Sequence, residues 1–254
     1  DVYRALHDQS YKDWQMVAVI GDSTDGSKQL LESDFPWVEI IDSGHNIGFA
    51  GGHNLVFQKY QCEYFQLLNP DLILEQNYIE LLVAALDASS STGAAIGKLY
   101  FYNFAKKLKS NLIDSVGGGM SPSGRSYEHG QFQEDIGQFE KPEEVFWACG
   151  AAVMYRKTAL EAVKLVIDNK AEYFDPDFHS YWEDTDLGWR MKLLGWKSLY
   201  IPTAVAYHGK GIKPVQNQFR HPIQFMRLRR DLDSQVRAAV YFNNIWTYIK
   251  NSPR

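Results

Sequence analysis

The segment Phe178–Arg190 concentrates the side chains best suited to acid–base chemistry. It holds Glu183, Asp184 and Asp186 where an apolar periodicity indicates the start of a helix. Carboxylates are stabilised there because the unpaired amides of a helix start carry partial positive charge. The segment is also rich in large aromatic residues, namely Tyr181, Trp182 and Trp189. Aromatics remove water from nearby charges, which favours a catalytic role, but structural networks show the same pattern, so the segment alone leaves both interpretations open.

The composition of the 254-residue chain is that of an ordinary globular protein. Hydrophobic residues make up 45% of it and aromatic residues 14%, enough for one large domain or a domain with an appendage. The two cysteines, Cys62 and Cys149, argue against a disulfide framework and fit a reducing compartment. No apolar run approaches the length of a bilayer span and no secretory leader opens the chain, so we expect a cytoplasmic or peripheral protein.

Charge is distributed unevenly along the chain. Residues 209–254 contain nine Lys or Arg and two acidic residues, whereas the preceding part contains 17 basic and 29 acidic residues. Such a basic tail is expected to face a diphosphate, an anionic membrane surface or nucleic acid. Nucleic acid is disfavoured because the rest of the chain is acidic and carries no nucleic-acid-binding module. The chain lacks an initial methionine, so we expect a fragment of a longer polypeptide.

Strand-like and helix-like segments alternate over the first hundred residues. The expected strands are Trp14–Ile20, Trp37–Ile41, Glu63–Leu68 and Ala94–Gly97. The expected helices are Val2–His7, Lys28–Glu32, a helix that follows Asn46–Asn54 and ends at Tyr60, and Asn77–Ala88. This alternation predicts an α/β fold, a three-layer sandwich with a mostly parallel central sheet. Ligands bind such sheets at the loops that follow the strands.

The second half of the chain is less regular. The part from Tyr100 to Glu144 is predicted to be turns and a long loop, typical of a lid or a partner-binding segment. The elements expected after it are strand Val145–Tyr155, helix Lys157–Ile167 and strands Lys197–Ile201 and Ala204–Tyr207. The predicted units are a domain over residues 1–208 and a basic C-terminal segment over 209–254.

The C-terminal segment contains an amphipathic helix within Arg227–Lys250. Its apolar face consists of Ala238, Tyr241, Phe242, Ile245, Tyr248 and Ile249. We expect this face to pack on the core, with a membrane surface as the alternative. The basic residues Arg227, Arg229 and Arg230 are then expected near phosphates of a donor, an acceptor or a membrane.

Six segments, in this order along nearly the whole chain, carry a family resemblance. They are Ser23–Ser27, Asn46–Asn54, Leu67–Asp71, Ala148–Met154, Trp182–Leu187 with Gly195-Trp196, and Ala206–His208. With them the sequence resembles family 2 glycosyltransferases of the GT-A fold, particularly the bacterial rhamnosyltransferase-like branch. The resemblance implies a Rossmann-like nucleotide-diphospho-sugar transferase. It also implies that the family's first strand, a wall of the nucleotide pocket, lies upstream of Asp1.

The resemblance implies a divalent metal, Mg²⁺ or Mn²⁺, on the diphosphate of the donor. Its expected ligands are Asp71 and His208, and carboxylate and phosphate oxygens suit such hard cations. Asn69 stands at the first position of the family's DxD metal motif, where it can offer only a neutral oxygen. A plain Asn-Pro-Asp turn is the competing interpretation of this segment.

The resemblance also implies roles around the reacting sugar. Asp184 matches the general base of inverting members. Glu183 and Asp186 are then expected to bind the acceptor or to support the base, and Trp182 is expected to bind the acceptor. The residues expected to contact the nucleotide or donor are Asp22, Asp25, Gly48, Gly51, Gly52, Asn54 and Asn69. The chain departs from the family at Ile20-Gly21, which replaces an acidic pair near the nucleotide base.

The implied function is inverting transfer of a sugar, with rhamnose as the expected one, from a dTDP- or UDP-sugar. The expected acceptor is a hydroxyl of a bacterial cell-surface glycan or of a polyprenyl-linked glycan, and the expected location is the cytoplasm or the inner face of the plasma membrane. A carbohydrate-binding or scaffold protein without turnover is the alternative, supported by Asn69 and Ile20-Gly21. A nucleotidyltransferase is a third alternative. It would need a glycine-rich basic first loop, and that region is expected upstream of the given sequence, so this alternative is only weakly excluded.

Overall fold

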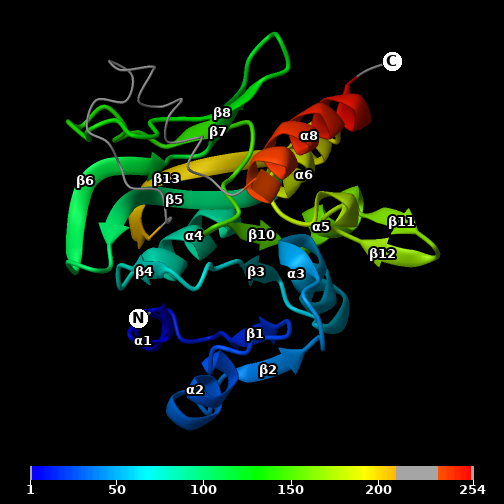
Figure 1. Ribbon diagram of the computed structural model, residues 1–254. Coiled ribbons are helices and arrows are strands. Elements are labelled where there is room, and N and C mark those ends of the chain that lie inside the picture. The colour runs from blue at the N-terminus through cyan, green and yellow to red at the C-terminus, as the bar shows by residue number, and fades with distance from the viewer. Residues whose placement is uncertain (1, 210–233, 253–254) are drawn as a thin grey trace.

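The computed structural model describes residues 2–209 and 234–252 (Figure 1). Its central sheet joins strands that are far apart in the sequence. The strand order is β3 (Tyr64–Gln66), β10 (Met154–Arg156), β5 (Thr92–Asn103), β13 (Lys197–His208) and β4 (Leu72–Leu74), with β6 (Leu108–Ser115) on β5 and β9 (Glu143–Val145) on β13. The expected α/β class is therefore confirmed.

The central sheet is mixed, so the prediction of a mostly parallel sheet was wrong. Within this sheet, as far as its strands are described, β5 and β13 pair in parallel and the other pairings are antiparallel. The reason is that β10 enters between β3 and β5 from a loop rather than from a crossover helix, and parallel pairing needs a crossover. A second parallel pair, β1 (Val17–Ile20) with β2 (Glu39–Asp42), is joined through α2 (Ser27–Asp34) and forms a separate sheet.

Helices cover the central strands on both sides (Figure 1). In that view α4 (Tyr78–Asp87) lies below β5 and β13, whereas α6 (Glu183–Leu193) and α8 (Ser234–Asn251) lie above them. The remaining helices described are α1 (Val2–His7), α3 (Gly48–Lys59), α5 (Lys157–Val163) and a 3₁₀ turn at Pro176–Phe178. The arrangement has the three layers that the sequence predicts.

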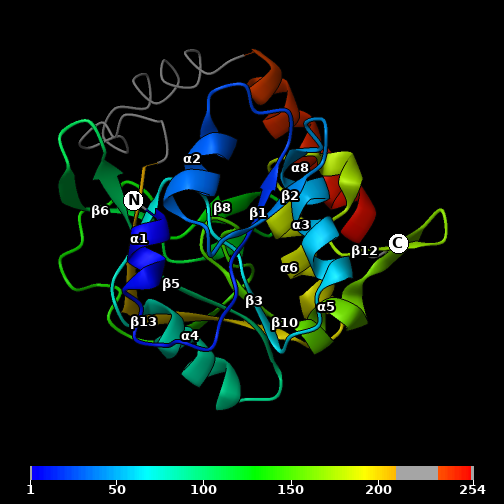
Figure 2. The ribbon, with the colours of Figure 1, turned by 90° about the horizontal axis from the view of Figure 1, so that it is seen from below.

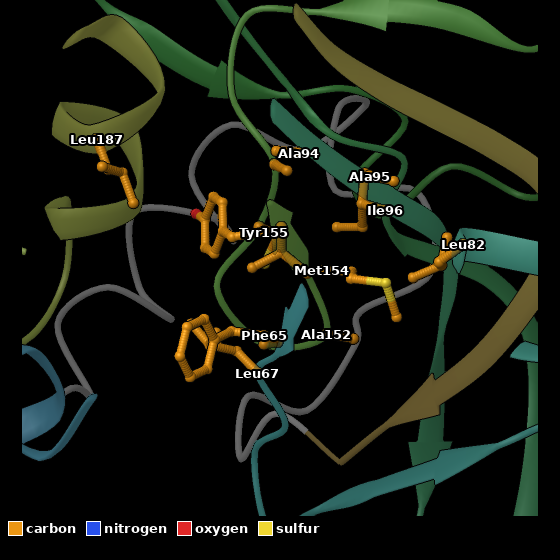
Figure 3. Packing of buried hydrophobic residues seen from close by; sticks show 14 of the residues in the cluster. Phe65, Leu67, Leu82, Ala94, Ala95, Ile96, Ala152, Met154, Tyr155 and Leu187 are labelled. Carbon is orange, nitrogen blue, oxygen red and sulfur yellow. The ribbon is translucent and has the colours of Figure 1, made fainter. Parts of the chain in front are cut away.

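The main core surrounds β10, which lies between β3 and β5 in the central sheet (Figure 3). Successive side chains of a strand point to opposite faces, so Tyr155 faces Leu187 of α6 whereas Met154 lies toward Leu82 of α4. Strand β5 is buried on both faces over its first eight residues, as expected for the centre of a three-layer fold. The two short strands expected near Pro202 are one strand, β13, because a register shift between Ile201 and Val205 accommodates the proline.

Short strands occupy the region that was expected to be a long loop. Besides β6 and β9 they include β7 (Gly118–Met120) and β8 (Ser126–Glu128), which pair with each other. A small core of Ile113, Val116, Val145 and Tyr200 stabilises them, and the buried Lys98 ammonium bonds Asp135 at 2.8 Å. Similarly, the helix expected to reach Ile167 ends at Val163 and gives way to a hairpin of β11 (Leu165–Ile167) and β12 (Lys170–Glu172).

Figure 2 shows β1 and β2 side by side, with α2 next to them. A groove lined by residues of β1 and of β3 lies between this pair and the central sheet. The cavity measures about 960 Å³, with Ala18 of β1 on one wall and Phe65 of β3 on the other. The unit β1–α2–β2 has its own small core, formed by Ala18, Ile20, Leu31 and Val38. The groove therefore lies at the junction of two separately packed parts.

Helix α8 packs on the domain in an unexpected orientation. The apolar face expected to be buried is exposed, and Asn243, Thr247 and Asn251 are buried instead. Arg227, Arg229 and Arg230 lie outside the described residues. None of the helices within residues 2–209 and 234–252 is both long and apolar enough to span a bilayer.

Candidate active site

Asp184 lies in the first turn of α6, with its carboxylate held in a defined position. Its Oδ2 accepts a hydrogen bond from the Gly150 amide at 2.9 Å, and its Oδ1 accepts one from the Thr185 amide at 2.7 Å. Bonds from two backbone amides fix a carboxylate more firmly than contacts to flexible side chains. A Cβ at Gly150 would lie 3.5 Å from Asp184 Oδ2 and 3.2 Å from the Phe49 ring, so a glycine suits this approach.

The loop that leads into α6 has an unusual backbone. His179, Tyr181 and Trp182 have φ angles of 54°, 72° and 74°, a region that non-glycine residues rarely adopt. The Asn243 side-chain amide of α8 donates to three carbonyl groups of this loop, those of Phe178, Ser180 and Tyr181. Helix α8 thereby holds the strained loop that positions Asp184.

Glu183 is buried beside Asp184, and these surroundings favour its neutral form. Burial raises the pKa of Glu183 well above its usual range, and the neighbouring charge of Asp184 adds to this. Its Oε2 has no hydrogen-bond partner among the described residues, as suits an uncharged acid. Because Glu183 is buried, the structure argues against the predicted contact with an acceptor and favours a supporting role.

Replacing Glu183 with glutamine is expected to stabilise the protein at neutral pH. The pKa is higher in the folded than in the unfolded state, so ionisation of the unfolded chain makes wild type progressively less stable as pH rises above about 4.5. Glutamine has nearly the same shape and does not titrate. Thermal unfolding should show a higher midpoint for Glu183→Gln at pH 8 and a vanishing difference near pH 4.5; a pH-independent difference would contradict the prediction.

Asp186 is engaged in structural contacts rather than in the predicted acceptor contact. Its Oδ2 pairs with Arg190 Nη2 at 2.8 Å, and its Oδ1 accepts from Asn251 Nδ2 at 2.7 Å. Its side chain is buried, so a sugar hydroxyl could reach it only if these bonds broke. Trp182, by contrast, is partly exposed at the start of α6, and its contact with an acceptor stays a prediction.

The predicted metal ligands Asp71 and His208 are adjacent. His208 Nε2 lies 3.3 Å from Asp71 Oδ1 and 3.4 Å from Asn69 Nδ2. On the other side of the ring, His208 Nδ1 bonds Asp114 Oδ2 at 2.7 Å, and Asp114 is fully buried. Burial alone would lower the pKa of His208, but bonds to Asp114 and Asp71 outweigh it and raise the pKa to about 9. Partial burial would raise the pKa of Asp71, yet His208 lowers it.

The donor set fits partial ligation of a divalent ion. Two ligand atoms at about 2.1 Å from a metal and about 90° apart are separated by about 3 Å, close to the Asp71–His208 distance. The Asp114 carboxylate accepts the bond from Nδ1, so loss of the Nε2 proton would leave Nε2 free to bind a metal. Within the described residues no three His, Cys, Asp or Glu side chains form a cluster able to hold a metal. Any ion here would need oxygen atoms from a diphosphate or from water.

The residues predicted to contact the donor fall into two groups. Gly48, Gly52 and Asn69 line the groove between the two sheets. Asn54, by contrast, is buried, and its side-chain oxygen accepts from the Tyr173 and Phe174 amides. Asn54 therefore makes structural contacts in place of the predicted donor contact. These contacts fix α3 to the segment that follows β12 and leads into the active-site loop.

The glycines at positions 48 and 51 also have an internal explanation. Gly48 has a φ of +70°, and a Cβ there would lie 2.5 Å from His179 Nδ1. Gly51 packs against Ile47, which would lie 3.0 Å from an added Cβ. The glycines thus permit close packing of α3 on its own preceding turn and on the active-site loop.

Asp22 and Asp25 lie on the exposed turn between β1 and α2. Asp25 Oδ1 accepts a hydrogen bond from the Ser27 amide at 3.0 Å, which closes an Asx turn just before α2. Hydrogen bonds from the Ser27 side chain, and to a lesser extent from its amide, lower the pKa of Asp25. Asp22 does not line the described groove, and its contact with a nucleotide stays a prediction.

The segment Gly150-Ala151 connects Asp184 with the predicted metal ligands through hydrogen bonds. The Gly150 amide binds Asp184, and the next residue, Ala151, accepts a hydrogen bond from the Asn69 amide at 2.9 Å. Asn69 in turn approaches His208. Consecutive Cα atoms are about 3.8 Å apart, so these links put Asp184 on the order of 10 Å from Asn69. The base candidate and the metal candidate therefore belong to one region.

Two residues of this region were absent from the sequence-based site. Asp114 was missed because it lies in the part expected to be a loop, and no local pattern links it to His208. Gly150 lies within the expected strand Val145–Tyr155, where small residues leave room for another group to approach closely. The approaching groups are the Phe49 ring and the Asp184 carboxylate.

Comparison with solved structures identifies the fold as GT-A. Residues of the chain superpose on GalNAc-T7 with UDP, GalNAc and Mn²⁺ with a TM-score of 0.63 at 12% identity, covering 98% of this chain and 54% of that chain. S. aureus TarS 1–349 with UDP-GlcNAc superposes with a TM-score of 0.57 at 14% identity, covering 99% of this chain and 68% of that chain. Mannosyltransferase PcManGT from Pyrobaculum calidifontis with GDP-Man and Mn²⁺ superposes with a TM-score of 0.54 at 15% identity, covering 98% of this chain and 67% of that chain.

The family follows from the sequence. The model of glycosyl transferase family 2 matches residues 1–164, and the chain belongs to that family. It is 25% identical over 207 residues to the N-acetylglucosaminyl-diphospho-decaprenol L-rhamnosyltransferase of Mycobacterium tuberculosis (strain ATCC 25618 / H37Rv). That match covers 74% of this chain and 64% of the relative. The GT-A fold and the rhamnosyltransferase-like resemblance expected from the motifs are thus confirmed.

Proposed function

We propose that the protein is a metal-dependent inverting glycosyltransferase that moves a sugar from a nucleotide-diphosphate donor to an acceptor hydroxyl. The observation that carries the proposal is the placement of Asp184. Its carboxylate is fixed by the Gly150 amide, one residue from the segment bonded to Asn69 and close to the Asp71–His208 pair. Membership of glycosyl transferase family 2 supports it.

In this mechanism Asp184 removes the proton from the acceptor hydroxyl. The oxygen attacks the anomeric carbon from the face opposite the diphosphate, the bond between that carbon and the phosphate oxygen breaks, and the nucleoside diphosphate leaves with the electron pair. The configuration inverts in this single displacement. Neutral Glu183 keeps a second negative charge away from the attacking oxygen.

Asp71 and His208 are the residues that would hold Mg²⁺ or Mn²⁺, with Asn69 beside them. The bound ion would offset the charge that develops on the leaving diphosphate. Support comes from the adjacency of the two side chains and from the Mn²⁺ in the complexes of GalNAc-T7 and of the Pyrobaculum enzyme.

For the donor we propose a dTDP- or UDP-sugar, with rhamnose as the transferred sugar. For the acceptor we propose a polyprenyl-linked glycan, at the cytoplasmic face of a membrane. The mycobacterial relative is named for L-rhamnosyl transfer to an N-acetylglucosaminyl-diphospho-decaprenol, and this supports both choices.

A screen of nucleotide sugars by thermal shift, with and without Mn²⁺, tests the donor proposal. A donor that binds the native state at 100 times its Kd stabilises it by about 2.7 kcal/mol, and the unfolding temperature rises accordingly. We expect a shift with one nucleotide sugar that requires Mn²⁺ and is accompanied by transfer or slow donor hydrolysis. Equal unfolding temperatures with every donor would contradict the proposal.

A carbohydrate-binding homologue without turnover is the second candidate. It is favoured by Asn69 at the first metal position and by the lack of a three-ligand metal cluster among the described side chains. Such a protein would show neither hydrolysis nor transfer of any donor, with or without Mn²⁺. Donor turnover therefore separates the two functions.

A further inference from the structure

Helix α8 is amphipathic, but its polar side faces the protein. Asn243, Thr247 and Asn251 follow one another at intervals of four residues and are buried. Asn243 donates to the active-site loop, and Asn251 Nδ2 donates to Asp186 Oδ1 at 2.7 Å. Residues four apart share one face of a helix, so these bonds fix the rotation of α8 about its axis.

The opposite side of α8 is an apolar face open to solvent. It consists of Tyr241, Phe242, Ile245, Trp246, Tyr248 and Ile249, each between 43% and 65% exposed. Aromatic side chains present about 150–250 Å² each, so the exposed part of this face amounts to roughly 600 Å². Contiguous apolar patches of this size on soluble proteins indicate a binding surface.

We propose that the α8 apolar face docks on an anionic membrane surface. Its composition suits the boundary between water and lipid, because Trp and Tyr combine an apolar ring with a polar tip. The sequence adds a net positive charge next to α8, since residues 209–254 contain nine basic and two acidic residues, most of them outside the described part of the chain. A second copy of the chain fits less well, because the face is smaller than the about 800 Å² that each partner of a stable interface buries.

The proposal rests on the proposed transfer to a polyprenyl-linked acceptor and gives it a location. Helix α8 is bonded to both ends of the segment that carries the base candidate, through the loop before α6 and through Asp186 within it. Figure 1 shows α8 and α6 side by side on the outside of the domain, and their contacts agree. Docking through α8 therefore brings Asp184 close to the lipid surface that holds such an acceptor.

Vesicle flotation of the full chain tests the docking. We expect the protein to float with vesicles of phosphatidylcholine and phosphatidylglycerol at low salt. Recovery should be weaker with phosphatidylcholine alone, and weaker in about 1 M salt, where charges are screened beyond about 3 Å. The variant Phe242→Gln, Ile245→Gln, Ile249→Gln removes apolar area without lowering helix propensity, and it should reduce vesicle affinity about tenfold or more.

A matched variant replaces the same number of exposed apolar residues elsewhere. Leu108→Gln, Ile136→Gln and Val166→Gln lie away from α8, and this variant should float like wild type. Absence of flotation, equal flotation of the two variants, or self-association without lipid that the α8 variant abolishes would overturn the proposal.

Activity distinguishes failure of docking from failure of the proposed function. The α8 variant should transfer sugar to a water-soluble acceptor that lacks the lipid at the wild-type rate, and lose transfer to the lipid-linked acceptor in vesicles. Wild type that floats yet turns over no donor would leave docking intact and refute the transferase proposal. Wild type that transfers to both acceptors equally well without vesicle binding would refute docking alone.

Discussion

Asp184→Asn is expected to abolish sugar transfer while donor binding stays nearly unchanged. The asparagine oxygen can still accept the Gly150 bond, but the amide cannot take a proton from the acceptor hydroxyl. Loss of a general base lowers the turnover rate by about 10²–10⁴-fold. Initial rates with saturating donor, together with a donor thermal shift, measure the two effects separately.

The control for Asp184 is a nearby acid outside the proposed machinery. Asp177 is 75% exposed and pairs with Lys250 at 3.0 Å, so Asp177→Asn should leave turnover within about twofold, since exposed ion pairs contribute little. Turnover retained by Asp184→Asn would remove Asp184 from the role of base.

Loss of Mn²⁺ binding is the second large expected effect. His208→Ala and Asp71→Asn each remove one of two adjacent donors and should lower Mn²⁺ affinity, measured by paramagnetic resonance in the presence of nucleoside diphosphate, by about 100-fold or more. The buried Asp114 acts through His208, so Asp114→Asn should cost about 10–100-fold, with the fold retained because the side chains have the same shape.

The exposed pair His7 and Asp8 provides the matched control for the metal site. Their side chains lie 3.4 Å apart, much like the proposed ligands, but both are 76% exposed. The variants His7→Ala and Asp8→Asn should bind Mn²⁺ like wild type. Equal affinity of His208→Ala and wild type would show that the ion, if bound, lies elsewhere.

The fold could be predicted largely because its strands and helices carry strong local patterns. The first hundred residues alternate between apolar β-branched runs and helical periodicity, and most of their elements were found with boundaries off by a few residues. The short strand β4 was missed, and β5 continues to Asn103, beyond the expected end at Gly97. The direction of strand pairing could not be predicted. The pairing direction depends on β10 entering the sheet from a loop. The residues of β10 do not indicate which strands pair with β10.

Site residues that belong to sequence motifs could be predicted. The roles of residues that depend on burial could not. Asp71 and His208 are far apart in sequence, yet the motifs indicated both, and they are 3.3 Å apart. Asn54 and Asp186 were interpreted as ligand contacts because polar side chains in a motif suggest binding. Their buried hydrogen bonds to the 172–174 segment and to Arg190 show that they assemble the site instead. Sequence alone does not distinguish an exposed polar residue from a buried and satisfied one.

Because the β1–α2–β2 unit has its own small core, we expect this unit to unfold locally while the rest of the protein stays folded. Among the residues that the structure describes, four buried side chains form that core, whereas the central sheet shares one large cluster with α4 and α6. Units with few buried contacts exchange their amide hydrogens through local unfolding that leaves the rest intact. A ligand that bridged the groove would suppress this partial opening, so protection from exchange in β1 and β2 would report occupancy of the groove.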